Sequence, residues 1–267
     1  MDIQLICSDI DGTLLNKDRE LSKVTIEQVK RLSSIPFILI SSRMPRAMTH
    51  LQIEFGNEHL PLIAYNGGLL IDNGKIIDST EINVYIIKDL NRFIDGTSLH
   101  LSLYHNDEWY VPEMDFWANR ESNNTKVIPI VQNIDITIKN WELSNKGAHK
   151  IMVMGDASFL DNLVTYITKN YSEELIGYRS KDTYLEIAHK SISKKTAIEV
   201  LLKSHFPELT MENVLAFGDN FNDIEMLNAV GIGVAVANGV KEILDIADAT
   251  TDTNKEDGVA KYLKTYL

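Results

Sequence analysis

Two pairs of aspartates have residue types and spacings that could do chemistry. The first pair, Asp9 and Asp11, follows the apolar run 3–8 and precedes Gly12. Residues two apart on an extended chain point the same way, about 6.6 Å apart at roughly 3.3 Å per residue. A phosphoryl group could therefore sit near Asp9 with its leaving oxygen near Asp11, while Gly12 lets the backbone turn sharply beside it. The same Asp-x-Asp-Gly pattern also occurs in calcium loops and turns, so this segment alone leaves both interpretations open.

The second pair, Asp219 and Asp223, lies in the segment Gly-Asp-Asn-Phe-Asn-Asp directly after an apolar run at 213–217. Two carboxylates and two amide side chains, one of them Asn222, offer the oxygen ligands that a hard divalent cation prefers. The alternative is a helix N-cap at Asn222 or Asp223. A cap accounts for one polar residue of the segment but not for four, so the segment predicts a metal-binding loop.

These loops need elements that hold them together. Short apolar runs alternate with helical patterns in the first and last parts of the chain. Strands are expected at 3–8, 37–40, 61–65, 213–217 and 231–237, and helices at 22–32, 193–205, 223–230 and 240–247. Apolar strands alternating with helices indicate a parallel sheet covered on both faces. The carboxyl edge of such a sheet is where open α/β folds bind ligands.

The middle of the chain has a different pattern. Alternating polar and apolar residues at 99–105 and 108–111 predict exposed antiparallel strands, and Ser158 is expected to cap a helix. Upstream, Asn73-Gly74 between two apolar runs predicts a hairpin. The predicted fold class is therefore α/β. A doubly wound, Rossmann-like parallel-sheet core at 1–80 and 187–267 would carry an inserted α+β cap domain at 81–186.

Composition excludes several classes of protein. The 267 residues carry 26 Lys and Arg against 38 Asp and Glu, a net charge of −12, which argues against nucleic acid as a partner. The single cysteine, Cys7, excludes an intramolecular disulfide, and the seven histidines show no metal-ligand spacing. The apolar runs are too short to span a bilayer and no signal peptide is visible, so we expect a cytoplasmic protein without a membrane partner.

Together with further motifs in the same order, the aspartate segments resemble the haloacid dehalogenase-like hydrolase superfamily, which consists mostly of phosphatases. Ser41 stands where the family has a Thr or Ser at the end of its second strand, and Lys194 stands where it has a Lys at a helix start. The Asn-Gly-Gly stretch at 66–68 and Asn238 are similar to the Cof-type subgroup. In that subgroup a large cap is inserted after the third core strand.

This resemblance implies a Mg²⁺-dependent phosphatase that hydrolyses a small phosphorylated metabolite, such as a sugar phosphate. Asp9 would attack phosphorus to give an aspartyl-phosphate. Asp11 would protonate the leaving oxygen and then take a proton from the attacking water. Ser41, Lys194 and Gly12 would bind the phosphate.

The resemblance also implies metal ligands and substrate contacts. Asp9 and Asp219 would hold Mg²⁺ by their side chains and Asp11 by its backbone carbonyl, with Asp223 as a direct ligand or as support for the others. The residues expected to contact the substrate lie in the loops around the site or in the cap. They are Ser42, Arg43, Asn66, Gly67, Asn222 and Lys150.

The chain departs from the family pattern at two places. Ser42 stands where Gly is common, and Lys195 follows Lys194 where the family has Lys-Gly, so the choice of Lys194 rests on alignment with Ser193. Two alternative functions remain: a phosphosugar mutase on the same scaffold, and a non-catalytic protein that binds a phosphometabolite. A sensor would not need Asp11 or both acidic loops. We expect a monomer or a small homo-oligomer.

Overall fold

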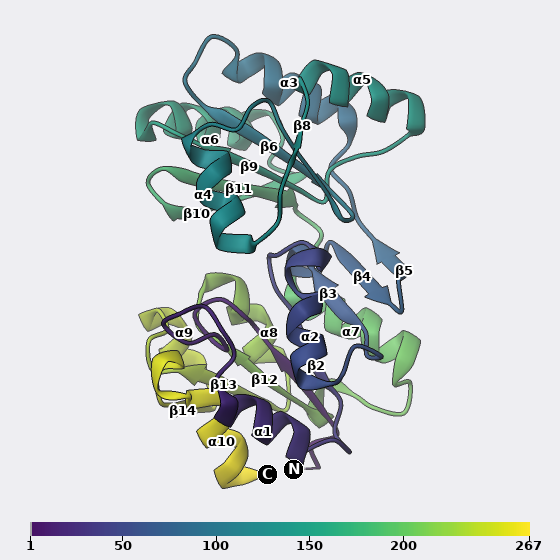
Figure 1. Ribbon diagram of the computed structural model, residues 1–267, viewed down its shortest axis with the longest axis vertical. Helices are drawn as coiled ribbons and strands as arrows, with labels where there is room; N and C mark the ends of the chain where they lie inside the picture. The colour runs from purple at the N-terminus through teal and green to yellow at the C-terminus, as the bar shows by residue number, and fades with distance from the viewer. Residues whose placement is uncertain (1) are drawn as a thin grey trace. The chain divides into compact units, whose positions relative to one another are not determined.

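The computed structural model describes residues 2–267, with the backbone alone at Ser180. The chain forms two compact units, each with its own sheet (Figure 1). The core unit comprises residues 2–43, 48–78 and 193–267, and the inserted unit comprises residues 44–47 and 79–192.

The core unit is built on a five-stranded parallel sheet with strand order β14-β13-β12-β1-β2. Its strands are β1 (Leu5–Ser8), β2 (Phe37–Leu39), β12 (Val214–Gly218), β13 (Ile232–Val236) and β14 (Ala249–Thr251). Its helices are α1 (Lys23–Arg31), α2 (Thr49–Phe55), α7 (Lys194–His205), α8 (Ile224–Ala229), α9 (Lys241–Ile246) and α10 (Gly258–Tyr266). Ala216 packs in one cluster with residues of α7 and α8, whereas its neighbour Phe217 meets Tyr262 of α10. Helices therefore cover both faces, which confirms the predicted doubly wound core.

A smaller sheet of the core unit has the strand order β3-β4-β5. Its strands are β3 (Leu62–Ala64), β4 (Leu69–Asp72) and β5 (Lys75–Ser79). Asn73 and Gly74 join β4 to β5 with φ of 47° and 75°. Both are left-handed values, which Asn and Gly adopt at low cost, so the predicted hairpin is confirmed.

The inserted unit is built on a six-stranded mixed sheet with the order β10-β11-β9-β6-β7-β8. Its strands are β6 (His100–His105), β7 (Glu108–Val111), β8 (Ile130–Val131), β9 (Lys150–Met154), β10 (Leu175–Lys181) and β11 (Tyr184–His189). Its helices are α3 (Val84–Ile94), α4 (Phe116–Thr125), α5 (Ile134–Ser144) and α6 (Ala157–Asn170). Strand pairs are antiparallel except for β7 with β8.

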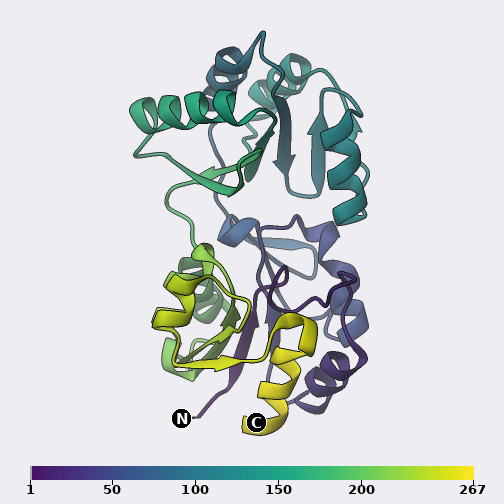
Figure 2. The ribbon, with the colours of Figure 1, turned by 90° about the vertical axis from the view of Figure 1, so that its left-hand side faces the viewer.

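The two faces of this sheet carry different helices because side chains alternate along each strand. Leu101, Ile151 and other apolar side chains pack against α3, α5 and α6 in one core. On the opposite face lies α4 (Figure 2). Its Trp117 meets the ring of Tyr184 edge-on. The inserted unit is therefore an α+β layer with its own hydrophobic core.

Most of the longer helices have a polar side chain at the N-cap. One of these caps, that of α6, was predicted wrongly. The N-cap of α6 is Asp156, whose carboxylate accepts the N–H of Ser158 at 2.8 Å, so Ser158 is not the cap. An Asp two residues upstream offers an equivalent acceptor, and spacing alone does not choose between them.

Short 3₁₀ turns lie at Pro45–Ala47, Tyr65–Gly67, Met211–Asn213, Phe221–Asp223 and Asn254–Glu256.

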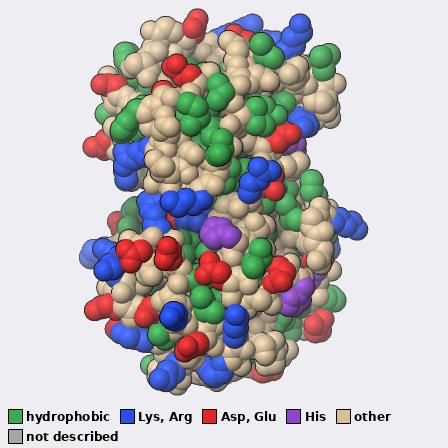
Figure 3. All heavy atoms as spheres, viewed as in Figure 1, with side chains coloured by type: hydrophobic (Ala, Val, Ile, Leu, Met, Phe, Trp, Pro, Cys, Tyr) green, Lys and Arg blue, Asp and Glu red, His purple; other side chains and the backbone are tan. Residues whose placement is uncertain are grey.

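The surface is mixed in charge. On the face drawn in Figure 3, Lys and Arg side chains are interspersed with Asp and Glu over both units. Within residues 2–267, no helix combines the length and apolar character that crossing a membrane requires.

Candidate active site

The loops that carry the predicted chemistry follow neighbouring parallel strands. Asp9 directly follows β1 and Asp219 directly follows β12, and these strands pair in register from Leu5 to Ser8. Ser41 follows Ile40, which forms a parallel bridge with Ile63 of β3 and so extends the same edge of the sheet. Because the carboxyl ends of parallel strands share one edge, these side chains are brought together there.

Four charged residues form what we call the carboxylate cluster: Asp9, Asp219, Asp223 and Lys194. Carboxylate oxygens of the three aspartates lie within 4.8 Å of one another. The Lys194 ammonium donates to Oδ1 of Asp9 and to Oδ1 of Asp223, both at 2.5 Å, and its side chain is fully buried. Ser193 caps α7 and so fixes Lys194 at the first position of the helix.

Burial and neighbouring charges shift the pKa values of Asp9, Asp219 and Lys194. Burial raises the pKa of Asp9 well above its ordinary value; Asp223 and Asp219 add to the rise, and Lys194 opposes it. Burial and the neighbouring Asp223 raise the pKa of Asp219 to about 6. Burial alone would lower the pKa of Lys194, but Asp223 and Asp9 raise it above its ordinary value. The cluster therefore holds more negative charge than its surroundings neutralise.

The carboxylate cluster fits a divalent cation. Three carboxylates and one ammonium have a formal charge of −2, and the pKa values of Asp9 and Asp219 are raised chiefly by burial and further by the neighbouring carboxylates. Carboxylate oxygens are the ligands that Mg²⁺ prefers. Asp9, Asp219 and Asp223 are accordingly the residues that could hold the ion.

Asp223 also shapes the loop in which it lies. Its Oδ2 accepts the backbone N–H groups of Asp219 and Asn220 at 3.0 and 3.1 Å. Its side chain does not cap α8, so the helix-cap interpretation of this residue does not hold. A Cβ at Gly218 would lie 2.5 Å from the Asp223 Cβ, so a glycine is needed for this approach.

The turn after Asp11 packs directly against Asp219. Gly12 has φ of +88°, and a Cβ there would lie 2.3 Å from Asp219 Oδ2. Thr13 donates its hydroxyl to Asp219 Oδ1 at 2.9 Å, and Asn238 donates its amide to the Gly12 carbonyl at 2.7 Å. Thr13 was missing from the predicted site residues, although its place after Asp-x-Asp-Gly was the available signal.

Asp11 and Arg43, which were predicted in different roles, contact each other. Arg43 donates from Nε to Asp11 Oδ2 at 2.6 Å and from Nη2 to Asp11 Oδ1 at 2.7 Å, a two-pronged pair. The Arg43 N–H also donates to Ser41 Oγ at 3.3 Å. Ser42 between them does not have a positive φ, so its Cβ causes no backbone strain where the family has Gly.

A second pair of loops meets beside Ser41. The Asn66 N–H donates to the Ser41 carbonyl at 2.8 Å, and the Asn222 amide donates to Asn66 Oδ1 at 3.0 Å. Gly67 has φ of +105°, and a Cβ there would lie 2.5 Å from the carbonyl of Ser193. The structure thus joins Asn66, Gly67 and Asn222 to the loops that hold Ser41 and Lys194.

Two other lysines, Lys195 and Lys150, bear on the predicted site. Lys195 is half-buried and pairs with Glu199 at 3.4 Å, so Lys194 is the residue that reaches Asp9. Lys150 lies on β9 of the inserted unit and is buried there. Its ammonium is 4.7 Å from the centroid of the Tyr104 ring and 3.8 Å from Glu186.

Comparison with known proteins identifies the family. A family model described as haloacid dehalogenase-like hydrolase matches residues 6–263. A Haemophilus influenzae protein named "Putative phosphatase" is 33% identical, covering 97% of this chain and 96% of its own. A Bacillus subtilis 5-amino-6-(5-phospho-D-ribitylamino)uracil phosphatase is 25% identical, covering 98% and 97%.

A solved structure agrees with this result. The crystal structure of a haloacid dehalogenase-like hydrolase from Bacteroides thetaiotaomicron matches with a TM-score of 0.89 and 26% identity, covering 99% of this chain and 100% of its own. The match extends over both units, and the predicted family, fold and enzyme class are confirmed. The chain belongs to the haloacid dehalogenase-like hydrolases and is an enzyme of their phosphatase type.

Proposed function

We propose that this protein is a Mg²⁺-dependent phosphatase that hydrolyses a small phosphorylated metabolite through an aspartyl-phosphate on Asp9. The observation that supports this most is the carboxylate cluster, with its two unbalanced negative charges at the carboxyl edge of a parallel sheet. Bound there, Mg²⁺ would neutralise charge on the cluster and on the phosphate.

The first step is attack of Asp9 on phosphorus with loss of the leaving oxygen. Lys194 favours the ionised form of Asp9 and orients it through its 2.5 Å hydrogen bond, and its positive charge offsets the charge of the incoming phosphate. Ser41 and the backbone around Gly12 are proposed to bind phosphate oxygens. The second step is attack of water on the aspartyl-phosphate, which releases phosphate and restores Asp9.

Asp11 is proposed as general acid in the first step and general base in the second. A carboxyl that carries the proton to be donated cannot accept hydrogen bonds on both oxygens as Asp11 now does from Arg43. We therefore expect this pair to open when the leaving oxygen binds, and to re-form when Asp11 has returned to the carboxylate. While the pair is open, the Arg43 guanidinium is proposed to contact the substrate.

The substrate class is proposed from the chemistry and from the relatives. The Bacillus subtilis relative acts on a phosphorylated ribityl compound, and a sugar phosphate or a similar small phosphate ester is the class we propose for this chain. We propose the segment 81–186 as the cap that selects the leaving group, with Lys150 as a candidate contact.

A phosphate-release assay tests the proposal. The purified protein, incubated with a panel of phosphorylated metabolites and Mg²⁺, should release inorganic phosphate, and EDTA should abolish the release. An isomerised phosphosugar without free phosphate would indicate the mutase instead. Binding of metabolites without any turnover would indicate a non-catalytic protein.

A further inference from the structure

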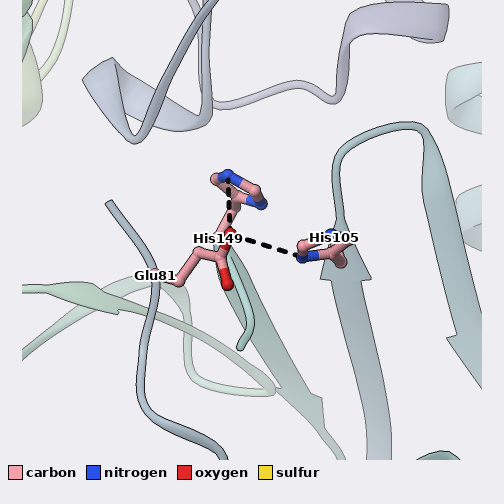
Figure 4. Close-up of side chains that lie close together, drawn as sticks. All are labelled: Glu81, His105 and His149. Atoms are coloured by element: carbon pink, nitrogen blue, oxygen red, sulfur yellow. Dashed lines mark ion pairs between the residues drawn. The ribbon is translucent and has the colours of Figure 1, made fainter. Parts of the chain in front are cut away.

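Three side chains of the inserted unit resemble a metal site by proximity. Glu81, His105 and His149 offer ligand atoms within 4.8 Å of one another, and both imidazoles face the Glu81 carboxylate (Figure 4). Glu81 Oε1 lies 3.7 Å from His105 Nδ1 and 4.0 Å from His149 Nε2. Two histidines and a glutamate are a zinc-binding set in many proteins. Proximity alone would suggest a metal site. The hydrogen bonds of the two imidazoles decide whether their nitrogens can bind a metal ion.

The backbone fixes the proton of His149. Its Nδ1 accepts the N–H of Asn106 at 3.1 Å, so Nδ1 carries no proton. The proton of the neutral ring is then on Nε2, which lies 3.0 Å from Ser79 Oγ and donates to it. Burial, followed by the neighbouring His105, lowers the pKa of His149 to about 3, which agrees with a neutral ring. The nitrogen that faces Glu81 is thus a donor and not a metal ligand.

The backbone also fixes a proton on His105. Its Nδ1 lies 2.9 Å from the carbonyl of Gly147, which can only accept, so Nδ1 carries a proton. Metal binding at both facing nitrogens would remove this hydrogen bond and would place a proton on His149 Nδ1 against the Asn106 N–H. Each buried polar group left without its partner costs free energy.

Two donors reach the Glu81 carboxylate directly. Glu81 Oε2 accepts the N–H of Gly147 at 2.6 Å, and Oε1 accepts the hydroxyl of Ser79 at 3.3 Å. His105 Nδ1 and His149 Nε2 lie 3.7 and 4.0 Å from Oε1, beyond hydrogen-bond distance, and the His149 proton reaches Glu81 only through the Ser79 hydroxyl. We propose that the Gly147 N–H and the Ser79 hydroxyl, the latter oriented by His149, form an internal carboxylate-binding site occupied by Glu81, which holds a carboxylate and not a metal ion. We call it the Glu81 latch.

The latch fixes the chain where it enters the inserted unit. Beside it, Ile82 and Ala148 exchange two backbone hydrogen bonds of 2.7 and 3.0 Å. A Cβ at Gly147 would lie 2.3 Å from the Ile82 carbonyl, so the two segments approach as closely as glycine allows. Residues 79–82 are thereby joined to the compact inserted unit. This inference does not depend on the proposed function.

The first test uses the unaltered protein. Nitrogen-15 NMR of the histidine rings reports which nitrogen carries the proton, and we expect Nε2–H for His149 and Nδ1–H for His105. Assignment of both rings would use the spectra of His105→Gln and His149→Asn. One equivalent of Zn²⁺ should leave both signals in place. A proton on His149 Nδ1, or zinc-induced shifts confined to these two rings, would overturn the latch and indicate a metal site.

The second test removes the carboxylate and offers another. Glu81→Ala should lower the midpoint of thermal unfolding by about 5 °C, and millimolar formate should restore part of that loss where equal chloride does not. Glu142→Ala is the matched control, because Glu142 is 28% exposed against 29% for Glu81 and pairs with the exposed Lys88. Formate should not rescue it. Equal effects of formate on the two variants would contradict a built carboxylate site.

Discussion

The carboxylate cluster and the Glu81 latch each bring three possible metal ligands within the same 4.8 Å, yet they are opposite in electrostatic character. In the first, three carboxylates face one ammonium, and burial first and the neighbouring carboxylates second raise the pKa values of Asp9 and Asp219. In the second, one carboxylate accepts the Gly147 N–H and the Ser79 hydroxyl, and the protons of His149 and His105 are taken by Ser79 and by the Gly147 carbonyl. The comparison teaches that the positions of protons, and not proximity, decide whether a cluster suits a cation.

The largest effect expected is from the amide substitution Asp9→Asn. It removes the proposed nucleophile and a metal ligand together, so turnover should fall by more than about 10⁴-fold in a phosphate-release assay. Glu81→Gln is the same substitution in the other cluster, and it should leave turnover of the order of the parent's. Circular dichroism checks that both variants are folded. If Asp9→Asn kept even a tenth of the activity, Asp9 would not be the covalent carboxylate.

Asp11→Asn should separate the two proposed steps. General acid catalysis contributes about 10²–10⁴-fold, and only when the leaving oxygen needs a proton. A sugar phosphate should therefore lose that much, whereas p-nitrophenyl phosphate, whose leaving group departs without a proton, should still give a burst of nitrophenol. The variant should then stall, since water activation needs a base.

The control for this variant is metal binding. Mg²⁺ affinity should be preserved in Asp11→Asn, because the proposed ligand there is a backbone carbonyl. An equal loss of the first step for both substrates would argue against Asp11 as the acid. Loss of metal binding would instead assign its side chain to the metal.

Asp219→Asn should weaken Mg²⁺ binding by at least about 10-fold, and activity should recover in part as Mg²⁺ is raised. A ligand that binds the folded state alone raises the unfolding midpoint, so thermal unfolding against Mg²⁺ concentration measures the change without relying on turnover. The Glu81→Ala variant should keep the parent's Mg²⁺ response. If no Mg²⁺ concentration altered the activity or the midpoint of Asp219→Asn, Asp219 would have another role.

Much of the fold was predictable because its signals are local. Alternating apolar strands and helices predicted the parallel sheet, and the residues that follow a strand, such as Asp9 and Asp219, share its carboxyl edge by geometry. Asn73-Gly74 predicted a hairpin because few residues adopt its backbone conformation. The prediction of Ser158 as a helix N-cap was wrong, because Asp156 supplies the same kind of acceptor two residues earlier.

The contacts that were not predicted join residues distant in sequence. Arg43 meets Asp11 because two loops converge at the sheet edge, and no pattern within either loop signals that pair. The histidines show no metal-ligand spacing, and 44 positions separate His105 from His149, which face each other only because β6 and β9 are paired. Even the final fold does not give the function of such a pair until its hydrogen-bond donors are assigned.

The smallest effect expected is the pH dependence that the latch gives to stability. His149 has a pKa of about 3 when folded, lowered chiefly by burial, against an ordinary value of about 6.5. Between these values the unfolded chain binds more protons than the folded one, so the free energy of unfolding falls as the pH falls from about 6.5. Above that range the ring is neutral in both states and contributes no pH dependence. The slope due to this one group approaches about 1.4 kcal/mol per pH unit.

His149→Asn isolates this contribution. The Asn side chain keeps an oxygen that can accept the Asn106 N–H but has no group that titrates in this range. Denaturant unfolding in EDTA at pH 7, 6 and 5 should show stability falling more steeply with acid in the parent than in the variant, whatever their difference at pH 7. Asp219, with its pKa raised to about 6, acts in the opposite direction, since its folded form binds the extra proton. Asp219 is present in both proteins, so its contribution cancels from the difference between their pH slopes. Equal slopes would mean that His149 is charged in the folded protein, and the proton assignment on which the latch depends would then be wrong.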